Sequence, residues 1–349
     1  MSFLDKEESL FAIDRSRMAD ALQAIPARVR AIAQTPFPAV DVDRHALTSI
    51  VVIGLGGSAI GGDLAAAMVM DQCTLPIIVL RGSVLPHWVQ SSTFVVAVSY
   101  SGNTAETIAA FRSARERRCP LVAIASGGKL AAAATDGGVP LLNPGTYSQP
   151  RLAVGAMTVL LLNIISSVTR KPCDDQLAVV ADAYHRVTSS VTPDVPTETN
   201  RAKMIAYQLL DRLPVVVAGG VLGPVARRWK TQLNENAKSL CVVEEMPELF
   251  HNTLEGLKLP VVASDSATWV FLEAPADQSV PLPQLDHFAT LLKKASLRVE
   301  RVRASLDNPH AALWWMIGMG DWVSYYLACL NNVDPTPVET IQAFKKPLV

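Results

Sequence analysis

The sequence predicts an α/β protein whose mainly parallel sheets are covered by helices on both faces. Between residues 50 and 165, short segments rich in valine and isoleucine alternate with longer segments of helical periodicity. The apolar segment 50–53 ends in the glycine-rich turn Gly54-Leu55-Gly56-Gly57-Ser58 and continues into an alanine-rich stretch. Buried strands joined by helices are typical of doubly wound folds, in which ligands bind at the carboxyl ends of the strands.

The same pattern assigns the elements of the first half of the chain. Residues 9–40 carry apolar side chains at helical spacing and are predicted to form one or two helices before the first strand. The predicted strands are 50–53, 76–80, 94–98, 121–125 and 139–142, and the predicted helices are 60–70, 104–117, 128–136 and 152–168. Residues 170–197 contain three prolines and a helical middle over 175–187, so they are expected to connect two domains.

The second half repeats the order found around residue 51. A predicted helix, 198–211, precedes an apolar strand that enters the glycine turn Gly219-Gly220, and a helix over 224–240 follows. We therefore expect a duplicated α/β unit whose turn lacks the serines. The other expected elements are strands 260–263, 268–273 and 297–302 and helices 284–294 and 311–330. The aromatic residues of the last helix predict a core or a subunit interface.

These assignments divide the chain into four parts. They are N-terminal helices (1–45), a first domain with the phosphate-binding loops (46–169), a linker with a helix (170–197) and a second domain (198–349). The segment 264–283 is acidic and contains prolines, and its sequence indicates no role.

Composition favours a small-molecule ligand. The net charge is −1 and no basic run is interleaved with aromatic residues, which argues against nucleic-acid binding. The five cysteines are widely spaced and odd in number, as expected for reduced thiols in a cytosol, and no metal-ligand spacing is present. The N-terminus is charged, and no uninterrupted apolar run approaches the ~20 residues of a membrane span. We therefore expect a cytoplasmic protein without a metal, a cofactor or a membrane partner.

The first glycine turn formally satisfies the dinucleotide fingerprint G-x-G-x-x-G/A. The acidic residue that would bind a ribose at the end of the second strand is missing, because Leu80-Arg81-Gly82 stands there. The Lys-Ser/Thr pair of a P-loop is also absent. An NAD(P)-dependent oxidoreductase is thus a weaker alternative than a phosphate held at the helix N-terminus. The glycines could also serve only close packing of the helix on the sheet.

A second polar loop follows the predicted strand 94–98. Its hydroxyls belong to Ser99, Ser101 and Thr104, and Glu106 opens the next helix. Hydroxyls and helix-opening N–H groups together can solvate a phosphate dianion without a metal, although a well-capped helix would show the same residues. The predicted phosphate-binding residues of the two loops are Gly57, Ser58, Ser99, Ser101 and Thr104.

Together the two loops resemble those of the sugar isomerase (SIS) domain family. Two further stretches, Arg227–Lys238 and Met246–Asn252, resemble the bifunctional phosphoglucose/phosphomannose isomerases, which are built from two SIS domains; the resemblance covers residues 46–346. It implies a homodimer without a cofactor, in which His251 reaches the partner's site. The resemblance also implies that Glu235 is the catalytic base and that His251 assists ring opening. It places Arg151 and Lys345 in the same active site. The adjacent Lys346 matches the lysine position as well.

These residue types suit the isomerisation of glucose 6-phosphate and mannose 6-phosphate to fructose 6-phosphate. A carboxylate such as Glu235 can move a proton between C2 and C1, and a histidine can donate to the ring oxygen. A fixed cation at Arg151 would stabilise a cis-enediolate. Each residue also has a purely structural interpretation. Glu235 could be a solvated side chain of a helix, His251 could be a structural histidine, and Arg151 could form an ion pair at the start of a helix. A non-catalytic sugar-phosphate sensor therefore remains the rival function, and the ratio of the two isomerase activities does not follow from the motifs.

Overall fold

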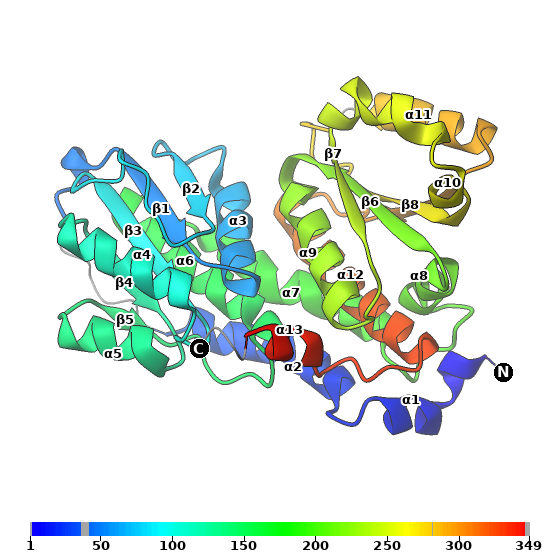
Figure 1. Cartoon of the computed structure of the whole chain (residues 1–349), viewed down its shortest axis with the longest axis horizontal. Coiled ribbons are helices and arrows are strands. Elements are labelled where there is room, and N and C mark those ends of the chain that lie inside the picture. Colours follow the sequence, from blue (N-terminus) through cyan, green and yellow to red (C-terminus); the bar gives the residue numbers. More distant parts are fainter. Residues whose placement is uncertain (1, 36–41, 281, 346–349) are drawn as a thin grey trace. The chain divides into compact units, whose positions relative to one another are not determined.

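The chain folds into two compact units in the computed structural model (Figure 1). The structure describes residues 2–35, 42–280 and 282–345. One unit, here called the five-stranded unit, spans residues 24–182, and the four-stranded unit combines residues 1–23 with 183–349. The boundaries fall within helices α2 (Met18–Ala33) and α7 (Asp174–Val191).

The five-stranded unit contains a fully parallel sheet with the strand order β2-β1-β3-β4-β5. Its strands are β1 (Ser49–Ile53), β2 (Ile77–Leu80), β3 (Thr93–Val98), β4 (Leu121–Ile124) and β5 (Leu141–Leu142). Every residue of β1 and β3 is buried, which explains their continuous apolar sequence. This order is the flavodoxin-like version of the doubly wound fold.

Helices cover both faces of this sheet (Figure 1). They are α3 (Gly57–Val69), α4 (Ala105–Glu116), α5 (Gly128–Asp136) and α6 (Val154–Thr169), preceded by the short helices η2 (Arg44–Ala46) and η3 (Pro150–Ala153). Helices α4 and α5 bury Phe111 and Leu130 against the face that carries Val51. On the opposite face α3 approaches closely, because a Cβ at Gly62 would lie 2.9 Å from Val52 Cγ1. Two glycines of α3, Gly61 and Gly62, thus serve packing.

Helix α6 is the most apolar element of the unit. Together with η3 it forms a segment, residues 150–169, that is long and apolar enough to cross a membrane, with a mean hydropathy of 2.0. In the structure 78% of this window is buried, and α6 packs against α3. Core helices commonly have this length and composition.

The four-stranded unit also contains a parallel sheet, with the order β7-β6-β8-β9. Its strands are β6 (Leu213–Gly219), β7 (Val242–Met246), β8 (Ala267–Glu273) and β9 (Arg298–Arg303). Its helices are η1 (Phe3–Asp5), α1 (Glu7–Ile13), α8 (Arg201–Leu209), η4 (Gly220–Leu222), α9 (Gly223–Glu235), η5 (Glu248–His251), η6 (Thr253–Lys258), α10 (Val261–Ser266), α11 (Leu282–Lys294), α12 (Pro309–Leu330) and α13 (Glu339–Lys345). The sheet repeats the order of the first four strands in the other unit, and the predicted fold class is confirmed.

One predicted strand is wrong. Residues 260–263 do not form a strand, because helix α10 begins at Val261, and Val261 and Val262 are 59% and 72% exposed. The strand beside β6 is instead β7, which the sequence pattern missed. It is an edge strand whose middle carries Glu244 and Glu245, so the apolar run that marks a buried strand is interrupted. Helix α13 was not predicted either.

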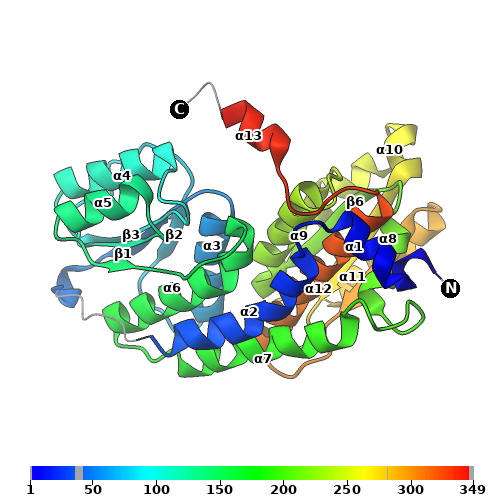
Figure 2. The ribbon, with the colours of Figure 1, turned by 90° about the horizontal axis from the view of Figure 1, so that it is seen from below.

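Helix α12 forms the core of the four-stranded unit with α8 and α9 (Figure 2). Its residues Trp314 and Trp322 are fully buried. A Cβ at Gly320 would lie 2.3 Å from Trp229 Nε1, so glycine is required there for α9 to approach. The Trp229 indole donates to the carbonyl of Met316 at 2.9 Å, which satisfies its polar atom.

A charged cluster joins α9 and α12 inside this core. The Arg228 guanidinium and the Asp321 carboxylate are 2.9 Å apart and are 1% and 0% exposed. The Tyr184 hydroxyl of α7 donates to the same carboxylate at 3.0 Å. Burial and the Asp321 charge raise the pKa of Tyr184 well above its ordinary value, so its hydroxyl keeps the proton that it donates. The cluster fixes α9 relative to α12.

We expect the loss of one member of this cluster to be costly. Asp321→Ala leaves the Arg228 charge buried without its carboxylate, and the free energy of unfolding should fall by about 3–5 kcal/mol. The double change Arg228→Met and Asp321→Leu should recover most of that loss, because no buried charge remains. Urea unfolding followed by circular dichroism measures both. The exposed pair of Arg17 and Asp20 provides a control, since Asp20→Ala should leave the unfolding curve unchanged. An Asp321→Ala curve that overlays the wild type would contradict this account.

Candidate active site

The glycine turn after β1 presents the N-terminus of α3 at the carboxyl edge of the sheet. Gly54 lies against β3, where a Cβ would come within 3.0 Å of the Val98 carbonyl oxygen. Gly56 has a φ of +55° and directly precedes the first residue of α3, Gly57. The N–H groups of the first turn of a helix have no intrahelical acceptor, so a helix N-terminus can receive an anion. Here the Ser58 N–H donates to the Leu55 carbonyl, just before the helix, at 3.2 Å. Ser58, in the same turn, is 7% exposed.

The loop after β3 brings the second set of hydroxyls to the same edge. The Ser99 hydroxyl donates to Thr104 Oγ1 at 2.9 Å, and Ser99 is 1% exposed. Ser101 is exposed, and its Oγ accepts the main-chain N–H of Asn103 at 3.3 Å. Because that bond uses an Oγ lone pair, the Ser101 hydroxyl can still donate its proton to a ligand. The loop joins the first one where Tyr100 N–H donates to Ser58 Oγ at 3.3 Å.

A third loop, between β4 and α5, completes this edge and was not predicted. Ser126 donates through both its main-chain N–H and its hydroxyl to the carbonyl of Tyr100, at 2.9 and 2.6 Å. The Asn103 side chain accepts the main-chain N–H of Lys129 at 3.1 Å, so it caps α5 from the neighbouring loop. These contacts involve main-chain atoms, and sequence patterns carry no signal for them.

The second and third loops also meet through their glycines. Gly102 has a φ of +67°, and a Cβ there would lie 1.8 Å from the carbonyl oxygen of Gly127. Only glycine fits at this position, because any side chain would push the two loops apart. We call the three loops, residues 54–58, 99–104 and 126–129, the polar edge.

Arg151 lies beside the first loop of the polar edge. A Cβ at Gly57 would be 3.5 Å from the Arg151 Cα, so the two main chains are in contact. The Arg151 side chain is 4% exposed and donates to Gln149 Oε1 at 3.2 Å. The structure therefore brings together all five predicted phosphate-binding residues and Arg151 within the five-stranded unit.

Tyr100 of the polar edge forms hydrogen bonds with the main chain of a second tyrosine, Tyr147. Tyr147 N–H donates to the Tyr100 hydroxyl at 2.6 Å, and that hydroxyl donates to the Tyr147 carbonyl at 3.0 Å. Burial raises the pKa of Tyr147 to about 12. The Arg28 guanidinium stacks 5.0 Å from the Tyr147 ring centre and also donates to the carbonyl of Thr146. Tyr100 of the polar edge is thereby anchored to the segment that precedes η3.

The corresponding turn of the four-stranded unit already holds a carboxylate. Gly219 and Gly220 follow β6 just as the first glycine turn follows β1, and Gly220 has a φ of +55°. The Asp277 carboxylate accepts the Val221 N–H at 2.9 Å, and a Cβ at Gly220 would lie 2.2 Å from its Oδ2. Asp277 belongs to the segment 264–283, for which the sequence indicated no role. A protein carboxylate thus accepts a main-chain N–H at the turn that corresponds to the first glycine turn of the other unit.

The other predicted site residues belong to the four-stranded unit. Glu235 is the last residue of α9, is partly exposed, and lies three turns beyond the start of the helix. His251 ends η5 and is exposed beside a cavity of about 500 Å³ with largely apolar walls, including Phe250 and Leu254. Lys345 ends α13, and its neighbour Lys346 lies outside the described residues. The roles of these residues stay predictions.

Comparison with known proteins shows to which family the chain belongs. Residues 198–348 match the bacterial phospho-glucose isomerase C-terminal SIS domain. A bifunctional phosphoglucose/phosphomannose isomerase of Caldicellulosiruptor bescii is 35% identical over 311 residues, which cover 88% of this chain and 92% of that protein. The chain belongs to the bifunctional phosphoglucose/phosphomannose isomerase family. Its members named as such include a protein of Aquifex aeolicus, 28% identical over 86% of this chain and 90% of its own.

The fold also matches solved SIS structures. The C-terminal domain of glucosamine-fructose-6-phosphate aminotransferase from Francisella tularensis superposes with a TM-score of 0.71 at 14% identity. The match covers 92% of this chain and 98% of that one. Membership of the isomerase family and the SIS fold together show that the chain is an isomerase with two SIS units, as the sequence resemblance implied.

Proposed function

We propose that the protein interconverts glucose 6-phosphate and mannose 6-phosphate with fructose 6-phosphate, by moving a proton between C2 and C1. The observation that carries this proposal is the polar edge of the five-stranded unit. Its hydroxyls surround a helix N-terminus, an arrangement that suits a phosphate dianion. Because Asp277 fills the equivalent turn of the four-stranded unit, we assign the phosphate to the turn of the five-stranded unit.

In this proposal the sugar is bound through its phosphate group. In the proposal Ser58, Ser101 and Thr104 donate to its oxygens, with the N–H groups of Gly57 and the first turn of α3. Ser99 contributes by donating to Thr104, which fixes the position of that hydroxyl. Binding energy from this non-reacting group orients the sugar carbons toward the base.

The chemistry needs a base, an acid and a fixed cation. In ring opening His251 protonates the ring oxygen while the C1 hydroxyl loses its proton to water. Glu235 then takes the proton from C2 and returns it to C1, and the hydroxyl proton of O2 passes to O1. Arg151 stabilises the negative oxygen of the cis-enediolate, a charge that is absent from the bound sugar. Lys345 is assigned to the same site. No metal or cofactor takes part in this scheme, because proton transfer between adjacent carbons needs only such side chains.

The first prediction concerns the phosphate. Ser101→Ala removes one donor to a charged group, which is worth on the order of 1.5–3 kcal/mol, so the KM for fructose 6-phosphate should rise roughly ten- to a hundredfold. Steady-state kinetics measure the change. The exposed Ser189 of α7 serves as the matched control, and Ser189→Ala should leave KM unaltered. An unchanged KM in Ser101→Ala would remove this hydroxyl from the site.

The second prediction concerns the base. Glu235→Gln keeps the shape of the side chain but removes its proton affinity, so turnover should fall by roughly a hundredfold or more while KM changes little. Deuterium at C2 of glucose 6-phosphate should wash out into water with the wild type and not with this variant. Glu116 is a fitting control because it also ends a helix and is exposed. If Glu116→Gln is fully active and Glu235→Gln still exchanges deuterium, another group is the base.

We further propose that the enzyme is a homodimer in which His251 serves the site of the partner subunit. The exposed position of His251 beside an apolar cavity supports this arrangement. Most aromatic residues of α12 cannot provide the interface, since Trp314, Trp322 and both tyrosines are buried within the unit itself and Trp315 alone among them is partly exposed. Exposed apolar side chains elsewhere, such as Ile341 and Phe344 of α13, are available for it.

Mixing inactive subunits tests the shared site. His251→Ala chains and Glu235→Gln chains, unfolded together and refolded, should form hybrids with one wild-type site, and each hybrid should regain about half of the native activity. Each variant refolded alone is the control and should stay inactive. Hybrids that form, as shown by affinity tags, but remain inactive would place Glu235 and His251 in the site of one chain.

A further inference from the structure

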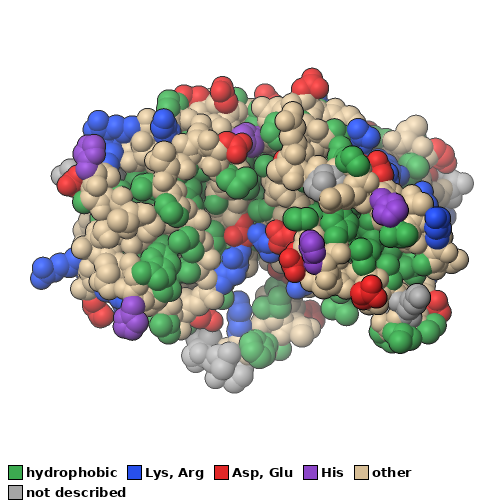
Figure 3. Space-filling model, turned by 90° about the horizontal axis from the view of Figure 1, so that it is seen from above, with side chains coloured by type: hydrophobic (Ala, Val, Ile, Leu, Met, Phe, Trp, Pro, Cys, Tyr) green, Lys and Arg blue, Asp and Glu red, His purple; other side chains and the backbone are tan. Residues whose placement is uncertain are grey.

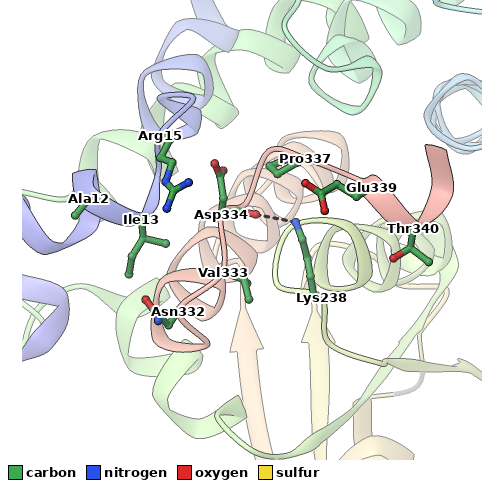
Figure 4. Close-up of a pocket in the computed structure, with 10 residues that line it drawn as sticks. All are labelled: Ala12, Ile13, Arg15, Lys238, Asn332, Val333, Asp334, Pro337, Glu339 and Thr340. Atoms are coloured by element: carbon green, nitrogen blue, oxygen red, sulfur yellow. Dashed lines mark hydrogen bonds between the residues drawn. The ribbon is translucent and has the colours of Figure 1, made fainter. Parts of the chain in front are cut away.

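The side chain of Lys238 joins two segments that are distant in the sequence. Its ammonium donates to the carbonyl oxygens of Glu235 and Asn236, at 2.8 and 3.2 Å, which end helix α9. It also contacts the carbonyl oxygens of Asp334 and Pro335, at 2.8 and 3.4 Å. The contact with Asp334 is drawn in Figure 4. One cation thus ties the end of the helix that carries Glu235 to a segment 96 residues further along.

The chemistry of a helix end explains why a cation is placed there. The last carbonyl groups of an α-helix have no intrahelical donor, and they form the negative end of the helix dipole. The Lys238 ammonium supplies donors and positive charge to these oxygens. Lys238 has a φ of +54°, a conformation that residues other than glycine rarely take. It belongs to the cap of α9, because the N–H of the next residue, Ser239, donates back to the Leu233 carbonyl at 3.1 Å.

A second bond strengthens the same connection. The Asn331 side chain, just beyond α12, donates to the carbonyl of Ala237 at 3.0 Å. The segment that Lys238 holds also borders a cavity of about 450 Å³, which Ile13, Arg15 and Lys238 itself line as well (Figure 4). Beyond this cavity it leads into α13.

We infer that Lys238 is a positioning residue for Glu235, an inference that rests on the proposed function of that carboxylate. The ammonium holds the main chain of Glu235 itself, so it limits where the carboxylate can lie. A base displaced by about 1 Å from its substrate carbon can lose roughly a hundredfold in rate. Lys238 does not contact the sugar in this scheme. It acts on turnover and leaves phosphate binding to the polar edge.

The test uses the full-length enzyme and the change Lys238→Met, which keeps the length of the side chain and removes its charge and donors. Since Lys238 is exposed, water can solvate the four carbonyl groups and the variant should fold. We expect kcat to fall roughly ten- to a hundredfold and KM to stay within about twofold. Hydrogen exchange of peptides covering residues 333–345 should become faster. Lys238→Arg, which restores charge and donors, should recover most of the lost kcat.

Lys230 is the matched control. It is an exposed lysine of α9 itself, five residues before Glu235, so Lys230→Met removes the same charge from the chain and should alter neither kcat nor the hydrogen exchange of residues 333–345. The inference is overturned if Lys238→Met keeps the wild-type kcat, or if KM rises as much as kcat falls. Equal losses in Lys238→Met and Lys230→Met would also overturn it. A failure of the proposed function would look different, because the wild type itself would then lack isomerase activity.

Discussion

The contacts between the loops of the polar edge are the constraint on which the proposed phosphate recognition depends. Gly102 and Gly127 meet so closely that no side chain fits between them, and main-chain groups of Tyr100 and Lys129 bind to neighbouring loops. A hydroxyl is useful to an anion only if it is held in place before the anion arrives, because ordering it later would cost binding energy. The sheet places the three loops at one edge, and these contacts hold the loops to one another.

The two units show how one fold can be used in two ways. Both sheets have the strand order 2-1-3-4 in their first four strands, and both place a glycine turn before a helix at the same edge. In the five-stranded unit that turn is surrounded by hydroxyls, whereas in the four-stranded unit Asp277 supplies the negative charge internally. The second unit is thereby free for a different task. Its helix α9 is fixed by the buried Arg228–Asp321 pair at one point and by Lys238 at its end, and it carries Glu235.

The sequence predicted the architecture well because buried parallel strands leave a strong apolar signal. The strands around β1 and β3 and the hydroxyl loops after them were located from that signal alone. The apolar signal missed β7, because this edge strand carries Glu244 and Glu245. The same signal predicted a strand at Val261 and Val262 that does not exist, since both valines are exposed in a short helix. The periodicity of apolar residues indicates which side chains are buried, but it does not indicate which strand lies at the edge of a sheet.

The same limit applies to the site. Ser101 and Thr104 were recognisable because hydroxyls before a helix have a known chemical use. Asn103, Ser126 and Asp277 act through main-chain N–H and carbonyl groups of distant segments, so their partners are visible only in the folded chain. Lys238 is similar, because it donates to carbonyl oxygens of two segments that are distant in the sequence. Resemblance to a family suggests candidate reacting groups, such as Glu235 and His251, more readily than the groups that would hold them in place.

The central claim is that this chain isomerises phosphosugars of both epimeric types at one site. The most direct measurement supplies fructose 6-phosphate to the purified enzyme and follows the formation of glucose 6-phosphate and mannose 6-phosphate in the same reaction. The account predicts that both products appear and that a competitive inhibitor suppresses both with a single inhibition constant. Binding of fructose 6-phosphate without either product, as expected for a non-catalytic sensor, would contradict it.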